Sequence, residues 1–264
     1  MSSESNGAKT FERWSEPHFY VKVMKTHQFS SVEYMLPEFP STMHFPLEPN
    51  AASDDKVASE DDMLAFLSKG IVTVEEKVDG SNCGMCFDGD IALFRNRNHI
   101  LNKAYRSRRT PAHQQYGPAW TWMHENRSAF ARLNAILEKP VSVYGEWMFA
   151  RHVLAYEALP SWMIAYDIFD IEASVFVAPT LSRPLLQEAG FHVVPLIAQG
   201  TFTPSDIMGF RDRPSAYGGT DQEGSYAKVE LNGVLVDRMK IVAPWFKTDP
   251  EWNKKPLVKN TLMK

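Results

Sequence analysis

The chain has 264 residues, of which 44% are hydrophobic and 23% charged, and its formal net charge is -4. This length is sufficient for one large domain with a sizeable core. The weak negative charge excludes a general attraction to polyanions, so any contact with nucleic acid must come from a local basic patch. No apolar run approaches the ~20 residues of a membrane span, and the chain starts without the apolar core of a signal peptide. We therefore expect a cytoplasmic protein without membrane contact.

Short strand-like runs outnumber helices along the chain. The alternation of apolar and polar residues predicts strands at 71–77, 82–87, 90–95, 141–148, 162–170, 191–196, 225–231 and 234–242. Helical periodicity predicts helices at 61–69, 119–138, 180–189 and 203–210. The pattern is typical of an α+β domain rich in antiparallel sheet. We expect a flexible N-terminal segment over 1–16, one domain over 17–250 and a basic C-terminal tail over 251–264.

Turn residues separate these elements at defined places. Asp88-Gly89 and Asn232-Gly233 each lie between two predicted strands, and such dipeptides favour tight hairpins. Gly70 and Gly190 each follow a predicted helix, where glycine commonly ends the helix. The sequence therefore predicts two hairpins and two glycine-terminated helices.

Lys77 stands at the end of the predicted strand 71–77, directly before the turn at Val78-Asp79-Gly80. A strand followed by a tight turn presents the amine at the exposed strand end, beside the backbone amides of the turn. This position suits a nucleophile. The alternative from this stretch alone is a surface lysine before a hairpin.

The stretch KVDGSN, residues 77–82, resembles the first motif, KxDGxN, of the covalent nucleotidyltransferases, which include DNA ligases, RNA ligases and mRNA capping enzymes. The resemblance implies that Lys77 attacks the α-phosphate of a nucleotide and carries the nucleoside monophosphate as a phosphoramidate. It also implies that Glu76, Asp79 and Asn82 contribute to the nucleotide site.

Further motifs similar to those of the family follow in the same order along the chain. Arg97 lies about 20 residues after the lysine and is similar to the arginine that meets the nucleotide or the 5′-phosphate, with Arg95 as the competing candidate. Glu146 in VYGEW is similar to the glutamate that accepts hydrogen bonds from the ribose. Tyr166 in YDI takes the place of the aromatic residue that stacks on the purine. Glu223 in EGSYAK is similar to the glutamate that serves the metal.

The run VDRMKIV resembles the closing KxK element of the family. Arg238 and Lys240 are two residues apart, so on a strand both point to the same face. The resemblance implies a clamp of two cations for the triphosphate, with arginine in place of the usual first lysine. We expect a nearby cation to lower the pKa of Lys77, because a charged amine cannot attack.

Two other patterns are weaker. Cys83 and Cys86 form a CxxC without a second pair, and on a strand their thiols face opposite sides, so we expect core residues and no metal or redox site. The densest basic stretch contains Arg106, Arg108 and Arg109. Together with Arg97 it is a candidate contact for a nucleic-acid backbone, and a solvated loop is the alternative.

The resemblance covers residues 37–242 and identifies the chain as a member of the ATP-dependent RNA ligase family. It implies an antiparallel-sheet-rich, ATP-grasp-like adenylyltransferase domain over 17–250 without an OB domain. The implied substrates are ATP, with AMP carried on Lys77, and RNA with 5′-phosphate and 3′-hydroxyl ends, joined with Mg²⁺ or Mn²⁺ in RNA repair. A helper protein or a structured RNA is a further expected partner. The alternatives are a minimal DNA nick-sealing ligase, a GTP-using transferase and an inactive nucleotide- or RNA-binding relative.

Overall fold

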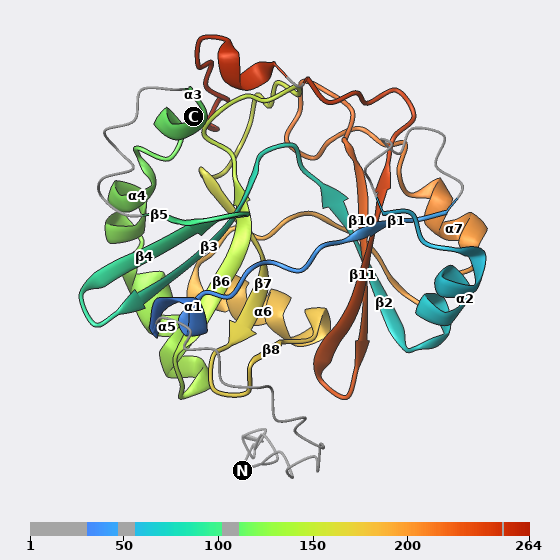
Figure 1. Ribbon diagram of the computed structural model, residues 1–264, viewed down its shortest axis with the longest axis horizontal. Helices are drawn as coiled ribbons and strands as arrows, with labels where there is room; N and C mark the ends of the chain where they lie inside the picture. Colours follow the sequence, from blue (N-terminus) through green and yellow to red (C-terminus); the bar gives the residue numbers. More distant parts are fainter. Residues whose placement is uncertain (1–30, 47–55, 102–110, 250) are drawn as a thin grey trace, which may run out of the picture.

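The computed structural model describes residues 31–46, 56–101, 111–249 and 251–264, and these form two sheets packed side by side (Figure 1). The first sheet contains, in spatial order, β1 (Met43–His44), β11 (Val234–Val242), β10 (Gly224–Leu231), β2 (Ile71–Lys77) and β9 (Leu196–Gly200). The second contains β5 (Ile100–Leu101), β4 (Ile91–Asn96), β3 (Ser81–Asp88), β6 (Val141–Trp147), β7 (Met163–Asp170) and β8 (Val175–Phe176). Apart from the β1–β11 pair, these strands pair antiparallel. The predicted α+β class is confirmed.

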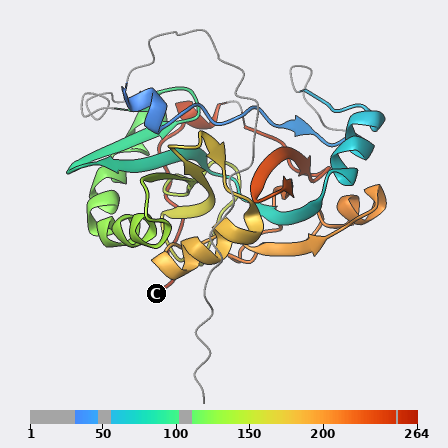
Figure 2. The same ribbon diagram turned by 90° about the horizontal axis from the view of Figure 1, so that it is seen from below.

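Helices flank both sheets. The described helices are α1 (Ser31–Met35), α2 (Glu60–Ser68), α3 (Pro111–Gln114), α4 (Ala119–Glu125), α5 (Arg127–Leu137), α6 (Pro179–Ala189), α7 (Pro204–Gly209) and the 3-10 helix η2 (Trp252–Lys254). In Figure 2, α5 and α6 lie on one side of the molecule and the chain from α1 to β1 runs along the other. None of the helices in the described part of the chain is long and apolar enough to cross a membrane.

Two predicted elements differ from the structure. The helix expected over 119–138 is interrupted at Asn126, whose φ of -100° and ψ of 11° are not helical, so α4 and α5 are separate. The strand expected over 191–196 begins only at Leu196. Before it, the backbone of Val194 bonds to Ala165 of β7 and to the Arg183 side chain. These partners take the place of a strand ladder, which explains why an apolar run is not a strand here.

The predicted turns are confirmed. Gly89 follows β3 with φ +54°, and Asn232 and Gly233 join β10 to β11 with φ of 53° and 80°. Both central positions of the second turn are left-handed, as a type I′ hairpin requires. Gly190 ends α6 with φ +98°, a value that side chains other than glycine rarely adopt.

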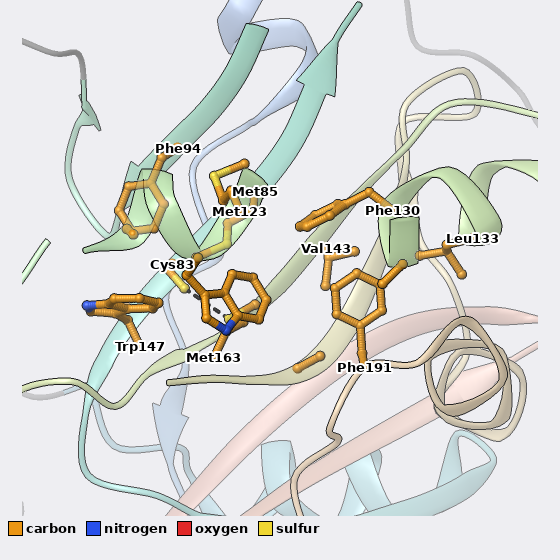
Figure 3. Close-up of a cluster of buried hydrophobic side chains, with 14 of the residues drawn as sticks. Cys83, Met85, Phe94, Met123, Phe130, Leu133, Val143, Trp147, Met163 and Phe191 are labelled. Atoms are coloured by element: carbon orange, nitrogen blue, oxygen red, sulfur yellow. Dashed lines mark hydrogen bonds between the residues drawn. The ribbon is translucent and has the colours of Figure 1, made fainter. Parts of the chain in front are cut away.

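The main core lies between the second sheet and helices α4, α5 and α6. Figure 3 shows its centre, where Trp147 and Phe94 from the sheet pack near Met123 of α4. Cys83 is fully buried in this cluster, whereas Cys86 belongs to a cluster on the opposite face of β3. Both cysteines are free. The two predicted core positions are confirmed.

The chain crosses from one sheet to the other at residues 78–80, between β2 and β3 (Figure 1). Lys77 is the last residue of β2. The fold therefore places this lysine at the junction of the two sheets, where side chains from both can surround it.

Candidate active site

A cavity of about 630 Å³ lies between the two sheets at this junction. Its volume is within the range of small-molecule sites, about 300 to 1,000 Å³. The residues predicted for the site that line it are Glu76, Lys77, Asp79, Asn82, Arg97, Glu146, Tyr166, Glu223 and Lys240. They come from β2, β3, β6, β7 and β11 and from the intervening turns. Segments that are distant in sequence thus converge on one cavity.

The strand register determines how far Lys240 and Arg238 lie from Lys77 along the sheet. Three cross-strand rows of β2, β10 and β11 are Lys77 with Gly224 and Val242, then Glu75 with Tyr226 and Lys240, then Thr73 with Lys228 and Arg238. Successive rows on one face are two residues, or about 7 Å, apart along the strands. Lys240 is therefore one row from Lys77, and Arg238 is two rows away.

Lys77 is paired with a carboxylate. Its ammonium donates a hydrogen bond to Glu223 and forms an ion pair with it. Burial by itself lowers the pKa of Lys77, but the charges of Glu223, Glu146 and Asp79 outweigh burial and raise the pKa above its usual value. The expectation that a nearby cation lowers this pKa is wrong for the free chain. The charges that act on Lys77 are those of three acids, and they raise its pKa.

Two of the glutamates that line the cavity, Glu146 and Glu223, have strongly raised pKa values. Burial raises the pKa of Glu146 to about 8, with the charges of Glu223 and Asp79 adding to the rise and Lys77 opposing it. Burial raises the pKa of Glu223 to about 7, with the charge of Asp79 adding to the rise and Lys77 and Lys240 opposing it. Near neutral pH the cavity therefore contains carboxyl groups that can both accept and donate hydrogen bonds.

The turn after Lys77 is fixed by its neighbours. The Asp79 carboxylate accepts hydrogen bonds from the backbone N–H groups of Val153 and Leu154, both at 2.8 Å. At Gly80, an added Cβ would lie 2.9 Å from the carbonyl oxygen of Trp147. A residue with a side chain does not fit there, so the turn packs directly against the end of β6 next to Glu146.

Glu76 points to the other side of β2 from Lys77. Its carboxylate accepts hydrogen bonds from the Ser215 hydroxyl at 2.5 Å and from the Ala216 N–H at 3.0 Å. Burial raises the pKa of Glu76, and these two hydrogen bonds oppose the rise. Glu76 thus ties the end of β2 to the loop before β10.

Asn82 and Tyr166 form the wall contributed by the second sheet. The Asn82 amide donates to the Tyr166 hydroxyl, and the buried Oδ1 of Asn82 has no hydrogen-bond partner among the described residues. Phe39 lies edge-on to the Tyr166 ring, with centroids 5.6 Å apart. The wall therefore combines an aromatic ring with an unsatisfied acceptor.

The two candidate arginines for the second motif, Arg97 and Arg95, lie in different environments. Arg97 is exposed and lines the cavity. Arg95 is buried and donates to the backbone oxygen of Leu36 at 2.6 Å, away from the cavity lining. The other predicted nucleic-acid contacts, Arg106, Arg108 and Arg109, lie outside the described residues.

Arg238 does not line the cavity with Lys240. Its guanidinium pairs with Asp167 at 3.1 Å and lies over the ring of Phe176, 4.3 Å from the centroid. The side-by-side clamp expected from the alternation is therefore absent in the free chain. Alternation correctly predicted that Arg238 and Lys240 share a face of β11. It did not predict that Arg238, one row further from Lys77 than Lys240, contacts the buried Asp167 of the opposite sheet.

Several lining residues were assigned no role from the sequence, among them Lys228, the last residue of the EGSYAK motif. Lys228 is almost fully buried and bridges Glu75 at 2.6 Å and Asp167 at 2.8 Å. A lysine within a strand usually indicates an exposed position, so its burial had to come from the fold. Trp252, from the segment 251–264 expected to be a tail, and Thr248, from the end of the expected domain, also line the cavity.

The acids present suit a loosely held divalent cation and not a dedicated metal cage. The described residues contain no group of three or more His, Cys, Asp or Glu side chains able to hold a metal ion. Mg²⁺ is commonly bound by one or two carboxylates together with water and substrate phosphates. Glu223, a single carboxylate at the cavity wall beside Lys77, fits that role in its deprotonated form.

The chain is similar to known proteins in sequence family and in fold. A family model described as RNA ligase matches residues 70–247. No curated protein sequence matches the chain significantly. Among solved structures, a Naegleria gruberi RNA ligase mutant without ligand aligns with a TM-score of 0.52 and 17% identity, covering 80% of this chain and 58% of that one.

Another mutant of the Naegleria gruberi RNA ligase, solved with ATP and Mn, aligns with a TM-score of 0.53 and 18% identity over 79% of this chain and 58% of that one. The same ligase with PPi gives 0.50 and 17% over 86% and 61%. At such identities the likeness establishes the fold. The chain spans about three-fifths of the length of these structures.

Proposed function

The chain belongs to the RNA ligase family, and from this premise we propose that it is an ATP-dependent RNA ligase whose nucleophile is Lys77. The observation that carries the proposal is the position of the Lys77 amine. It lies in contact with Glu223 in the cavity that Glu146, Tyr166 and Lys240 also line. The same cavity thus offers a nucleophile, two acids, a flat ring and a phosphate-binding cation.

In the first step Lys77 loses a proton, and Glu223 is the carboxylate in hydrogen-bond contact that can accept it. The neutral amine forms a P–N bond to the α-phosphorus of ATP, the P–O bond to the β-phosphate breaks, and pyrophosphate leaves with the electron pair. The second proton of the amine passes to solvent. Lys240, one row from Lys77, neutralises phosphate charge.

In the second step a 5′-phosphate oxygen of RNA attacks the phosphorus of the lysyl-AMP. A P–O bond forms, the P–N bond breaks, and the lysine nitrogen takes back a proton. In the third step the 3′-hydroxyl gives its proton to solvent and its oxygen attacks the 5′-phosphorus of the adenylated end. A P–O bond forms, the P–O bond to AMP breaks, and AMP leaves with the electron pair. When the Glu223 carboxylate is deprotonated it would hold a divalent cation, Mg²⁺ or Mn²⁺, and the cation would neutralise phosphate charge.

The wall of the cavity supports ATP over GTP. The buried Oδ1 of Asn82 needs a donor, and the 6-amino group of adenine is one, whereas guanine has an acceptor at this position. Tyr166 is a flat ring suited to stack on the purine, and Glu146 can bond the ribose hydroxyls. Glu76 and Asp79 would act on the nucleotide through the strand end and turn that they fix.

The RNA substrate, the extent of the catalytic domain over 17–250 and a cytoplasmic role in RNA repair remain parts of this proposal. The family favours RNA with a 5′-phosphate and a 3′-hydroxyl. A DNA nick is the competing substrate.

The proposal is tested by following label from nucleotide to polynucleotide. With α-labelled ATP and Mg²⁺ or Mn²⁺ the chain should become labelled, and α-labelled GTP should label it weakly. Adding 5′-phosphorylated RNA should move the label to the RNA end, and a matched DNA should accept less. A chain that stays unlabelled with both nucleotides and both metals would instead be an inactive binding relative.

Arg97 and Arg95 provide a matched pair for the second motif. We expect Arg97→Ala to raise the RNA concentration for half-maximal transfer about 10-fold, since a charge-assisted contact contributes ~1.5 to 3 kcal/mol, without changing the melting temperature. Arg95→Ala should lower the melting temperature, because the buried carbonyl of Leu36 loses its donor. Transfer titrations and thermal unfolding of both variants measure these effects. If Arg95→Ala weakened RNA transfer and Arg97→Ala did not, Arg95 would be the arginine of the second motif.

A further inference from the structure

The C-terminal segment 251–264 packs on the loop between β6 and β7, and in Figure 1 it lies at the upper left of the molecule and ends near α3. We call residues 148–159 the β6–β7 loop. Backbone hydrogen bonds join Arg151 to Val258, Leu159 to Thr261 and Thr261 to Tyr156. The segment is therefore part of the folded domain, and its basic residues are partly neutralised: Lys254 pairs with Glu251.

Asn260 is the centre of this packing. Its side chain is buried, with 6% of the residue exposed. Its amide donates to the carbonyl oxygens of Met148 at 2.9 Å and Ala150 at 3.3 Å, and its Oδ1 accepts from the Tyr156 N–H at 3.2 Å. One side chain thus joins both ends of the loop segment 148–156, and few other residue types have both donors and an acceptor to do so.

The β6–β7 loop in turn holds the turn that follows Lys77. The hydroxyl of Tyr156 accepts a hydrogen bond from the Asp79 N–H at 2.7 Å. The N–H groups of Val153 and Leu154 donate to the Asp79 carboxylate, both at 2.8 Å. Tyr156 is 1% exposed and Asp79 is 8% exposed, so these bonds are shielded from water and correspondingly strong.

The segment reaches the cavity at a second point. Trp252 stacks on His152 of the same loop, with ring centroids 4.0 Å apart and planes 28° from parallel. Both residues line the cavity. The loop is thus held from outside at Trp252 and Asn260 and holds Asp79 on its inner side.

We propose that Asn260 is a positioning residue for the nucleophile: it fixes the β6–β7 loop, the loop fixes Asp79, and Asp79 fixes the turn that aims Lys77. The inference rests on the proposed function and adds a residue near the C-terminus to its machinery. A displacement of about 1 Å at a reacting group can reduce a rate about 100-fold. Asn260 is therefore expected to affect the chemical step more than nucleotide binding.

The test compares Asn260→Ala with Val258→Ala. Val258 lies on the same segment, the residue is 54% exposed, and its backbone oxygen bonds to the loop. We expect Asn260→Ala to slow adduct formation at saturating ATP at least about 10-fold with a smaller change in KM, and Val258→Ala to leave the rate unchanged. A lowered melting temperature with an unchanged rate would overturn the proposal.

A double-mutant cycle traces the route of the effect. If Asn260 acts through Asp79, then Asn260→Ala combined with Asp79→Asn should be no slower than the slower single variant. Tyr226→Phe, on the opposite wall, should combine with Asn260→Ala multiplicatively. Multiplicative behaviour in both cycles would exclude the route through Asp79.

Amide hydrogen exchange tests the route without any activity. In Asn260→Ala, exchange should accelerate at the N–H groups of Asp79, Val153 and Leu154 and stay unchanged in β10, whereas Val258→Ala should match the unmodified chain. Unchanged protection at Asp79 would overturn the inference even in an active ligase. Absence of any adduct with accelerated exchange would instead contradict only the proposed ligase activity.

Discussion

Replacing Lys77 by alanine is expected to reduce formation of the covalent nucleotide adduct at least ~1,000-fold, because the attacking atom is removed. Lys77→Arg should lose the adduct equally. Arginine retains the positive charge beside Glu223 but does not deprotonate in proteins. The arginine variant therefore separates loss of the nucleophile from loss of the ion pair, and it should still bind ATP. Labelled-adduct gels and equilibrium ATP binding measure the two effects.

Lys69 is the matched control for Lys77. It lies just before β2, at the other end of the strand, and pairs with Asp237 at 2.5 Å on the surface. Lys69→Ala removes an equal charge from the same strand region and should leave adduct formation within twofold. Peptide mapping should locate AMP on Lys77. Label on Lys228 or Lys240, or an adduct that persists in Lys77→Ala, would refute the assignment.

Much of the candidate site could be predicted because its residues lie at strand ends with strong local signals. The alternating run of β2, the turn at 78–80 and the two hairpins at Gly89 and Gly233 fix where strands begin and end. Lys77, Glu146 and Tyr166 belong to motifs whose order along the chain follows the family. Strand pattern and motif order together therefore predicted which side chains line the cavity.

The errors arose where contacts between distant segments determine the partner or the pKa of a side chain. Alternation gives the face of Arg238 but not its partner, and Asp167 from the opposite sheet is the partner. The raised pKa of Lys77 depends on acids from three separate segments. The role of Asn260 depends on a loop more than 100 residues earlier. Propensity and motif carry no information on such pairings.

Asp167 joins the two sheets beside the cavity, and its replacement should show how much this junction stabilises the fold. Its side chain is fully buried on β7 of the second sheet. It accepts from Lys228 at 2.8 Å and from Arg238 at 3.1 Å, both from the first sheet. Asp167→Asn leaves the buried Arg238 without its carboxylate and leaves Lys228 with Glu75 alone, and removing one partner of a buried pair costs ~3 to 5 kcal/mol. We expect the free energy of unfolding to fall by about 3 kcal/mol.

Asp237→Asn provides the same substitution in an exposed pair. Asp237 and its partner Lys69 are 28% and 42% exposed, and surface pairs contribute about 1 kcal/mol or less. Urea unfolding should therefore show a large loss for Asp167→Asn and a small one for Asp237→Asn, with the loss for Asp167→Asn retained in 1 M salt because buried pairs are poorly screened. Equal losses would mean that Asp167 does not stabilise the junction. Since Lys228 also donates to the backbone oxygen of Tyr166 at 3.0 Å, a weakened junction should loosen nucleotide binding as well as the fold.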